Sequence, residues 1–233
     1  MQGRLLPKYQ GRYQAHPVGV WQQEFYKAAA LNLNCIEFIL DANDVHLNPL
    51  MQDSGHEEIL KLSEKTKVKV FTVCADYFMR WPLHHRDEKI AKQSQNVLKY
   101  LLLNGKIIGL TDIVIPCVDE SSVCDKISQE LLVKRLLPLV NEAEKYGINL
   151  SLETDLAPQP FAELLDCFDS TKVTVNYDTG NSAALGFEPK EEFSCYGKRI
   201  SDIHIKDRVF NGGSVLLGTG STKFKHFFVL LIP

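Results

Sequence analysis

The stretch ISDIHIKDR (residues 200–208) has the alternation of a buried strand, with isoleucine at every second position near its centre. The opposite face of that strand carries Asp202, His204 and Lys206. An acid, an imidazole and an ammonium group are costly to bury without partners. The pattern therefore predicts one apolar face that packs on helices and one polar face that serves a chemical purpose.

The same alternation recurs along the chain. Six strand-like runs are separated by helical patterns in which apolar residues repeat at i, i+3, i+4 and i+7. This rhythm predicts an α/β protein with parallel strands joined by helices and no linker between domains. No turn after a strand carries the glycine-rich signature of a nucleotide-binding sheet, so a (β/α)8 TIM barrel is favoured over a doubly wound sheet. The predicted strands cover residues 34–40, 67–78, 111–117, 148–154, 172–178 and 199–207.

Composition and charge restrict the functional class. The chain has 233 residues, enough for one large α/β domain, and its formal net charge of -3 gives no electrostatic case for nucleic acid. Six cysteines without a C-x-x-C pair predict reduced thiols in a cytoplasmic protein. The opening MQGRLLPKYQ has no apolar signal core, and the longest late apolar run, FFVLLI (227–232), is far shorter than the ~20 residues of a membrane helix.

Three polar residues stand near the carboxyl ends of three consecutive predicted strands. Glu153, Asp178 and His204 are 25 (178 − 153) and 26 (204 − 178) residues apart and share the inward parity. Because neighbouring strands lie ~4.8 Å apart, the three side chains can converge on one point. Two carboxylates and an imidazole suit manganese, magnesium, cobalt, iron or zinc. The structural alternative is that Glu153 pairs with Lys206 or Arg208 and that His204 is a hydrogen-bonded core histidine.

The motifs SLETD (151–155), VNYDTGN (175–181) and DIHIKDR (202–208), in this order and spacing, resemble the xylose isomerase-like TIM-barrel superfamily. This superfamily contains sugar and sugar-phosphate isomerases and 3-epimerases, hexulose-phosphate isomerase-like proteins, and apurinic-site endonucleases. The opening MQGRLLPKYQGRYQAHP resembles the segment that follows the first strand in its members. The resemblance implies one xylose isomerase-like domain over residues 1–233.

The resemblance also implies a mechanism. Its epimerases hold a divalent metal, often manganese, on a Glu, an Asp, a His and a second Glu from the last four strands. The first three match Glu153, Asp178 and His204. One glutamate, here Glu153, takes a proton from a ketose or ketose phosphate to give a metal-bound cis-enediolate, and the other glutamate returns one. The implied function is a metal-dependent isomerase or epimerase.

The second glutamate has no counterpart after His204. Counting one further βα unit places it beyond Pro233, and no apolar strand precedes MQGRL. We therefore expect an incomplete barrel, with the first strand partial or absent and the eighth missing at a truncated C-terminus. The run FFVLLI is the one candidate for a replacement strand, and it carries no carboxylate. We also expect slow or absent turnover, and association into homo-oligomers through the two open sheet edges.

Four further residues are expected to contact a substrate. Asn181 follows Asp178 by three positions, where family members often place a substrate-contacting His or Asn; its alternative role is a local turn. Glu37 has inward parity in its strand and is a candidate partner for a sugar hydroxyl or for a basic neighbour. Lys206 and Arg208 are candidates for a phosphate or a polar substrate end, and otherwise belong to a solvated loop.

Two rival functions remain open at this stage. The first is a catalytically incomplete barrel that binds a metal or sugar without turnover, which the missing glutamate favours. The second is an apurinic-site endonuclease, which needs extra histidines at the ends of early strands. FILDAND, CADYFMR and IPCVDE supply none there, so this function is disfavoured. The expected ligand is a small sugar or sugar phosphate, with no nucleic-acid or membrane partner.

Overall fold

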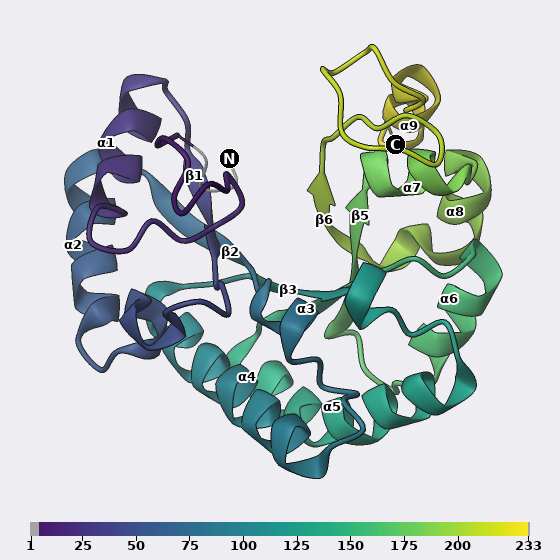
Figure 1. The fold of residues 1–233 in the computed structure, drawn as a ribbon, viewed down its shortest axis with the longest axis horizontal. Helices are drawn as coiled ribbons and strands as arrows, with labels where there is room; N and C mark the ends of the chain where they lie inside the picture. Colours follow the sequence, from purple (N-terminus) through teal and green to yellow (C-terminus); the bar gives the residue numbers. More distant parts are fainter. Residues whose placement is uncertain (1–4, 233) are drawn as a thin grey trace.

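A single curled parallel sheet organises the protein. The computed structural model describes residues 5–232. Its six strands are hydrogen-bonded in chain order and curve into an open barrel, with β1 and β6 on either side of the opening (Figure 1). The expectation of an incomplete TIM barrel is thus confirmed for the described residues. The strands are β1 (Cys35–Ile39), β2 (Lys69–Cys74), β3 (Asp112–Cys117), β4 (Asn149–Thr154), β5 (Val173–Asp178) and β6 (Ile200–His204).

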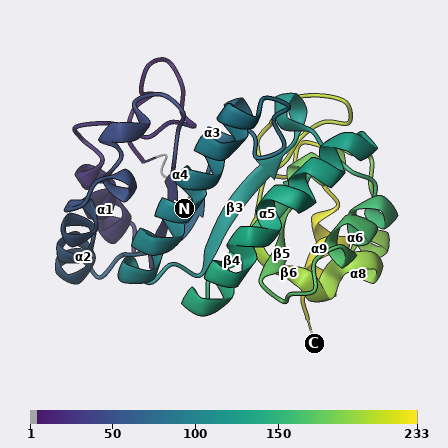
Figure 2. The same ribbon diagram turned by 90° about the horizontal axis from the view of Figure 1, so that it is seen from below.

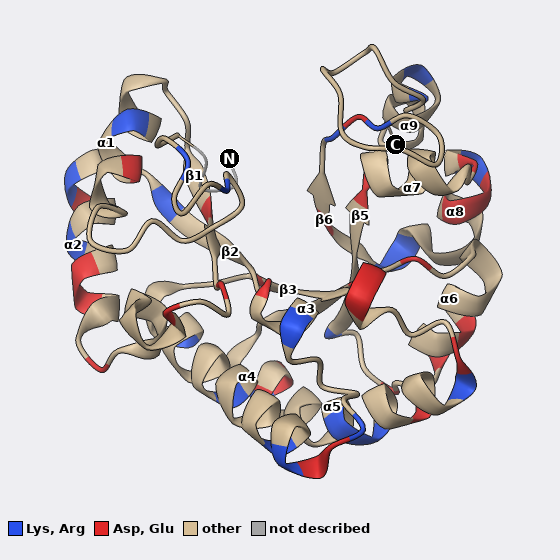
Figure 3. Ribbon diagram, in the orientation of Figure 1, with Lys and Arg blue, Asp and Glu red and all other residues tan. Residues whose placement is uncertain are grey.

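The helices form an outer layer around this sheet. The two longest, α4 and α5, pack side by side across the outside of its central strands (Figure 2). Lysines, arginines and acids are interspersed over the outer helices (Figure 3), and no described helix is long and apolar enough to cross a membrane. The helices are α1 (Gln22–Ala30), α2 (Gly55–Thr66), α3 (Tyr77–Arg80), α4 (Glu88–Ile108), α5 (Lys126–Tyr146), α6 (Pro158–Asp166), α7 (Thr179–Leu185), α8 (Pro189–Tyr196) and α9 (Phe224–Leu230).

The two faces of the sheet differ as the alternation predicts. Ile113, Leu150 and Val173 on successive strands are completely buried in the apolar core that the helices cover. Burial of this kind is the main stabilising term, at roughly 25 cal/mol per Å² of apolar surface. The apolar face therefore fixes the positions of the strands and, through them, of the polar face.

The inner face is polar even deep in the barrel. Asp112 accepts hydrogen bonds from the side chains of Asn149, Ser151 and Ser201, and the Ser151 and Thr174 hydroxyls lie 2.8 Å apart. These groups come from β3, β4, β5 and β6, so one hydrogen-bonded layer ties four strands together. Because each polar atom has a partner, the layer avoids the penalty of unsatisfied burial.

Both edge strands contain an irregularity in register. In β1 the pairing with β2 shifts between Ile36 and Glu37, and in β5 the pairing with β6 shifts between Val175 and Asn176. Such bulges re-aim the side chains that follow them. The second shift leaves Ser201 without a partner residue in the register, and Ser201 and Asp202 both face the interior.

Some sequence expectations on local structure are wrong. The segment Phe227–Ile232 is not a strand: Phe224–Leu230 is helix α9, whose Phe227 ring stacks on Tyr177 with centroids 5.4 Å apart. Strand β6 ends at His204, not at residue 207. Residues 5–21 contain no strand beyond an isolated bridge between Tyr9 and Arg12, and the opening residues 1–4 lie outside the described part.

Asp207 organises the loop that follows β6. Its carboxylate accepts hydrogen bonds from the backbone amides of Gly218, Gly220 and Thr222, at 2.8, 2.8 and 3.1 Å. Burial raises the pKa of Asp207, but the donors at Gly220, Thr222 and Gly218 outweigh it and lower the pKa overall. Asp207 is therefore a buried anchor of this loop.

Replacing Asp207 by Asn should loosen this loop without unfolding the sheet, because an amide oxygen is a weaker acceptor than a carboxylate with three donors. Hydrogen exchange should become faster at the amides of Gly218, Gly220 and Thr222, with strand amides unchanged. Asp169→Asn, at an exposed site, is the matched control. Unchanged protection of the three amides in Asp207→Asn would contradict this role.

Candidate metal and sugar site

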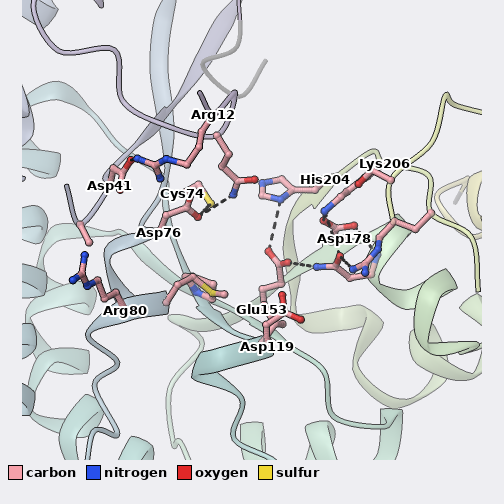
Figure 4. A pocket seen from close by; sticks show the side chains of 18 of the residues that line it. Arg12, Asp41, Cys74, Asp76, Arg80, Asp119, Glu153, Asp178, His204 and Lys206 are labelled. Atoms are coloured by element: carbon pink, nitrogen blue, oxygen red, sulfur yellow. Dashed lines mark hydrogen bonds and ion pairs between the residues drawn. The ribbon is translucent and has the colours of Figure 1, made fainter. Parts of the chain in front are cut away.

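A cavity of about 590 Å³ opens at the carboxyl ends of the strands. Glu153 from β4, Asp178 from β5 and His204 from β6 point into it from one side (Figure 4). TIM-barrel proteins place their chemistry at this end of the strands. The cavity is therefore where the sequence expects a site.

Glu153, Asp178 and His204 converge. Each offers one ligand atom, and these atoms all lie within 4.8 Å of one another. The expected spacing of roughly 5 Å is thus confirmed, while the role of the three residues as metal ligands stays a prediction. A second group of the same kind, Glu37, Asp202 and His204, shares the histidine.

Asp178 holds its own backbone as well as facing the cavity. Its Oδ1 accepts hydrogen bonds from the amides of Gly180 and Asn181 at 2.8 and 2.9 Å, which caps helix α7. Its Oδ2 lies 3.5 Å from the Lys206 ammonium. One oxygen is thus committed to the fold and the other is available to a ligand.

Glu153 is buried and held by two amides. Asn176 donates to Oε2 at 2.7 Å, and Asn181 donates to Oε1. Burial raises the pKa of Glu153 to about 7, and the Asp178 carboxylate adds to this rise. A carboxylate with such a pKa is suited to exchange a proton near neutral pH.

His204 lies between two carboxylates. Its Nε2 is 2.9 Å from Glu37 Oε2, and its Nδ1 is 3.7 Å from Glu153 Oε2 and 3.1 Å from the Asn176 amide nitrogen. Burial lowers the pKa of His204, but Glu37, Glu153 and Asp178 outweigh burial and raise it to about 9. His204 thus has a carboxylate on the side of each ring nitrogen.

The predicted substrate residues divide into two groups. Asn181, Lys206 and Arg208 line the cavity, and the Asn181 carbonyl oxygen accepts from Arg208 Nη1 at 2.8 Å and from Lys206 Nζ at 3.4 Å. Glu37 does not line the cavity; it contacts His204 and accepts a hydrogen bond from Thr72. The structure therefore brings the first group to the cavity and places Glu37 behind the histidine.

The Arg12–Asp41 ion pair, at 2.7 Å on the wall across from the cluster, escaped the sequence analysis (Figure 4). The same wall carries Asp76, which accepts a hydrogen bond from Gln14 at 3.1 Å. Asn176, which contacts both Glu153 and His204, also went unassigned. The sequence did contain a signal for Asn176, since it stands two positions before Asp178 and therefore on the same face of the strand.

The donor set fits a divalent cation. Glu153 and Asp178 are two buried carboxylates beside one imidazole, and the Lys206 ammonium lies 3.5 Å from Asp178. In addition, the Asn176 amide oxygen is buried without a hydrogen-bond partner among the described residues. Mixed oxygen and nitrogen donors in this number are typical of a catalytic metal site with open positions.

The fold and this site define an open parallel α/β barrel with a metal-type cluster at its mouth. The family model described as "Xylose isomerase-like TIM barrel" matches residues 25–232. The chain therefore belongs to the xylose isomerase-like TIM-barrel family, as its motifs predicted. A relative from Haemophilus influenzae, "Putative L-ribulose-5-phosphate 3-epimerase SgbU", is 22% identical over 91% of this chain and 79% of its own length.

Solved structures share the fold. D-allulose 3-epimerase from Methylomonas sp., in complex with D-allulose, has a TM-score of 0.71 and 18% identity, covering 90% of this chain and 73% of that one. The IOLI protein with a binding zinc atom has a TM-score of 0.70 and 18% identity, covering 90% and 78%. Proteins similar to this chain are thus sugar epimerases and isomerases.

Without metal, Glu153 and His204 should make the folded protein less stable as the pH rises from about 5 to 9, while His16 and His84, whose pKa values burial lowers to about 4, act in the opposite direction below pH 6.5. Folding raises the pKa of Glu153 from 4.5 to about 7, so its stabilising effect is complete below 4.5 and is lost as the pH rises through 7. Folding raises the pKa of His204 from 6.5 to about 9, and that contribution is lost between those values.

Denaturant unfolding in a chelator at pH 5, 7 and 9 measures this loss, and Glu153→Gln should flatten the part between pH 5 and 7. An equal slope in the variant and the parent over that interval would show that Glu153 does not titrate this way.

Proposed function

We propose that this protein is a divalent-metal-dependent isomerase or epimerase acting on a ketose or ketose phosphate. The observation that carries the proposal is the convergence of Glu153, Asp178 and His204 within 4.8 Å in the cavity at the strand ends. The relative named as an L-ribulose-5-phosphate epimerase and the fold shared with sugar epimerases support this substrate class. Manganese is our first choice of metal, with magnesium, cobalt, zinc and iron as alternatives.

Each residue of the site has a separate role in the proposed reaction. A bound cation supplies Lewis-acid polarisation of a substrate carbonyl. Glu153 takes the proton from the carbon beside that carbonyl, because its carboxylate faces the cavity beside Asp178 and His204. Asn181 and Asn176 hold the two oxygens of Glu153 in place. Lys206 and Arg208 stand beside Asn181, where they can bind a phosphate or hydroxyl groups.

Epimerisation needs a second acid, on the face of the substrate opposite Glu153, to return a proton from the other side. Among the described residues, Glu153 is the one glutamate that lines the cavity, and Asp207 is committed to the loop amides. For the described residues this favours the second candidate function, a barrel that binds metal and sugar without completing turnover. Asp76, on the facing wall, is the cavity acid that we propose as an alternative proton donor.

Metal binding should depend on Asp178. Asp178→Asn keeps an oxygen that can cap α7 but removes the anionic charge, so the variant should fold normally and bind Mn²⁺ more than about 100-fold more weakly. Calorimetric titration with Mn²⁺ measures this, with thermal unfolding as the check on folding. Asp41→Asn, on the facing wall, should bind as the parent does. Equal affinity in Asp178→Asn and the parent would exclude this metal site.

Proton transfer can be tested separately from turnover. Removal and return of a proton by Glu153 alone should exchange the carbon-bound hydrogen of a ketose for solvent deuterium, even where no epimer forms. With Mn²⁺ in D₂O, we expect exchange into ketopentoses, ketohexoses or their phosphates, measured by NMR, and a loss of ~10²–10⁴ in Glu153→Gln.

Binding of the sugar without exchange would support the non-catalytic function. Exchange that persists in Glu153→Gln would show that another base acts. If an epimer accumulates at the rate of exchange and is lost in Asp76→Asn, Asp76 is the opposing acid.

A further inference from the structure

The two ring nitrogens of His204 face different partners. Nε2 lies 2.9 Å from Glu37 Oε2, within ion-pair distance but outside hydrogen-bond geometry, while Nδ1 lies on the side of Glu153 and Asn176. An imidazole that donates from one nitrogen leaves the other as the acceptor or metal ligand. The partner of Nε2 therefore decides which nitrogen is presented to the cavity.

Glu37 is the residue that lies next to Nε2, and its own position is fixed by the fold. It extends from β1, is 6% exposed, and does not line the cavity that contains Glu153 and Asp178. Its second oxygen, Oε1, accepts a hydrogen bond from the Thr72 hydroxyl on β2 at 2.9 Å. The register shift before Glu37 sets it opposite Thr72. Both carboxylate oxygens are thus committed, and neither is available to a substrate in the cavity.

We propose that Glu37 is a positioning residue that accepts the Nε2–H of His204 and keeps Nδ1 directed toward Glu153 and Asp178. The proposal rests on the proposed metal centre and assigns Glu37 to the histidine instead of to a sugar hydroxyl. A carboxylate behind a ligating histidine fixes its tautomer and ring orientation, and losing such a partner typically costs 10–100-fold in metal affinity.

A competing arrangement uses the same residues. Glu37, Asp202 and His204 also bring ligand atoms within 4.8 Å of one another, and Asp202 Oδ2 and His204 Nε2 are both buried without a hydrogen-bond partner among the described residues. A cation held there would occupy Nε2 and displace the contact with Glu37. The ring nitrogen that carries the metal separates the two arrangements: metal on Nδ1 supports the positioning role of Glu37, and metal on Nε2 would make Glu37 and Asp202 ligands and overturn it.

The experiment compares Glu37→Gln with the parent in the full chain. The parent should bind one Mn²⁺ in calorimetry, and Glu37→Gln should still bind one, roughly 10–100-fold more weakly. Thr72→Val, which frees Oε1, should weaken binding by a smaller factor, about two- to tenfold. Glu192→Gln is the matched control, since Glu192 is an equally buried carboxylate that accepts from Tyr177, Ser182 and Tyr196. It should leave the affinity unchanged.

A second measurement distinguishes a positioning role of Glu37 from a general loss of protein stability. In the zinc-loaded parent, ¹⁵N NMR of the His204 ring should show a proton on Nε2 and the metal on Nδ1. Glu37→Gln should give a mixture of tautomers, and Glu192→Gln should not.

The outcomes separate this inference from the proposed function. If the parent binds no metal, the metal centre and this inference both fail. If the parent binds metal but Glu37→Gln has the same affinity and the same single tautomer, this inference alone fails. Two ions in the parent and one in Glu37→Gln would make Glu37 a ligand and overturn the positioning role.

Discussion

The contact between Glu37 and His204 joins the two edges of an open sheet. Strands β1 and β6 stand at opposite ends of the strand order, so no backbone ladder connects them in the described part of the chain. Their inner faces meet because the sheet curls, and a buried carboxylate then lies 2.9 Å from an imidazole. Removing one partner of such a pair is strongly destabilising, since the other charge stays buried. The curl of the sheet thus brings together the carboxylate and the imidazole on which the orientation of the proposed metal ligand depends.

The site concentrates more negative charge than its surroundings neutralise. Glu37, Glu153, Asp178 and Asp202 all lie close to His204, and burial raises the pKa of Asp202 to about 6, with Glu37 adding to the rise. Stability alone does not explain this excess of buried acids over cations, because well-packed apolar residues at the same positions would stabilise the fold as well or better. An arrangement that raises the pKa values of several carboxylates at a cavity is more typical of a functional site. The electrostatics therefore favour a bound cation as the compensating charge.

Alternation and strand spacing predicted much of the architecture. They located six strands, separated the apolar face from the polar one, and brought Glu153, Asp178 and His204 together. They did not reveal the register shift opposite Ser201, because a bulge leaves no mark in a pattern of period two. A short apolar run such as FFVLLI suits either a strand or a helix. The ring contacts of Phe227 with Tyr177 and Phe193, which accompany helix Phe224–Leu230, come from distant parts of the chain and cannot be read from the run itself. The loop role of Asp207 likewise depends on amides more than ten residues away.

Both irregular strand pairings lie next to the residues that meet. The shift in β1 precedes Glu37, and the shift opposite β6 precedes Asp202 and His204. Below them, the layer around Asp112 keeps regular hydrogen bonds between β3, β4, β5 and β6. The lower barrel thus fixes the strands, while the register shifts lie next to the residues that meet at its mouth. Because Ser201 is the extra residue of the second shift, that shift lies within β6, the strand that carries His204.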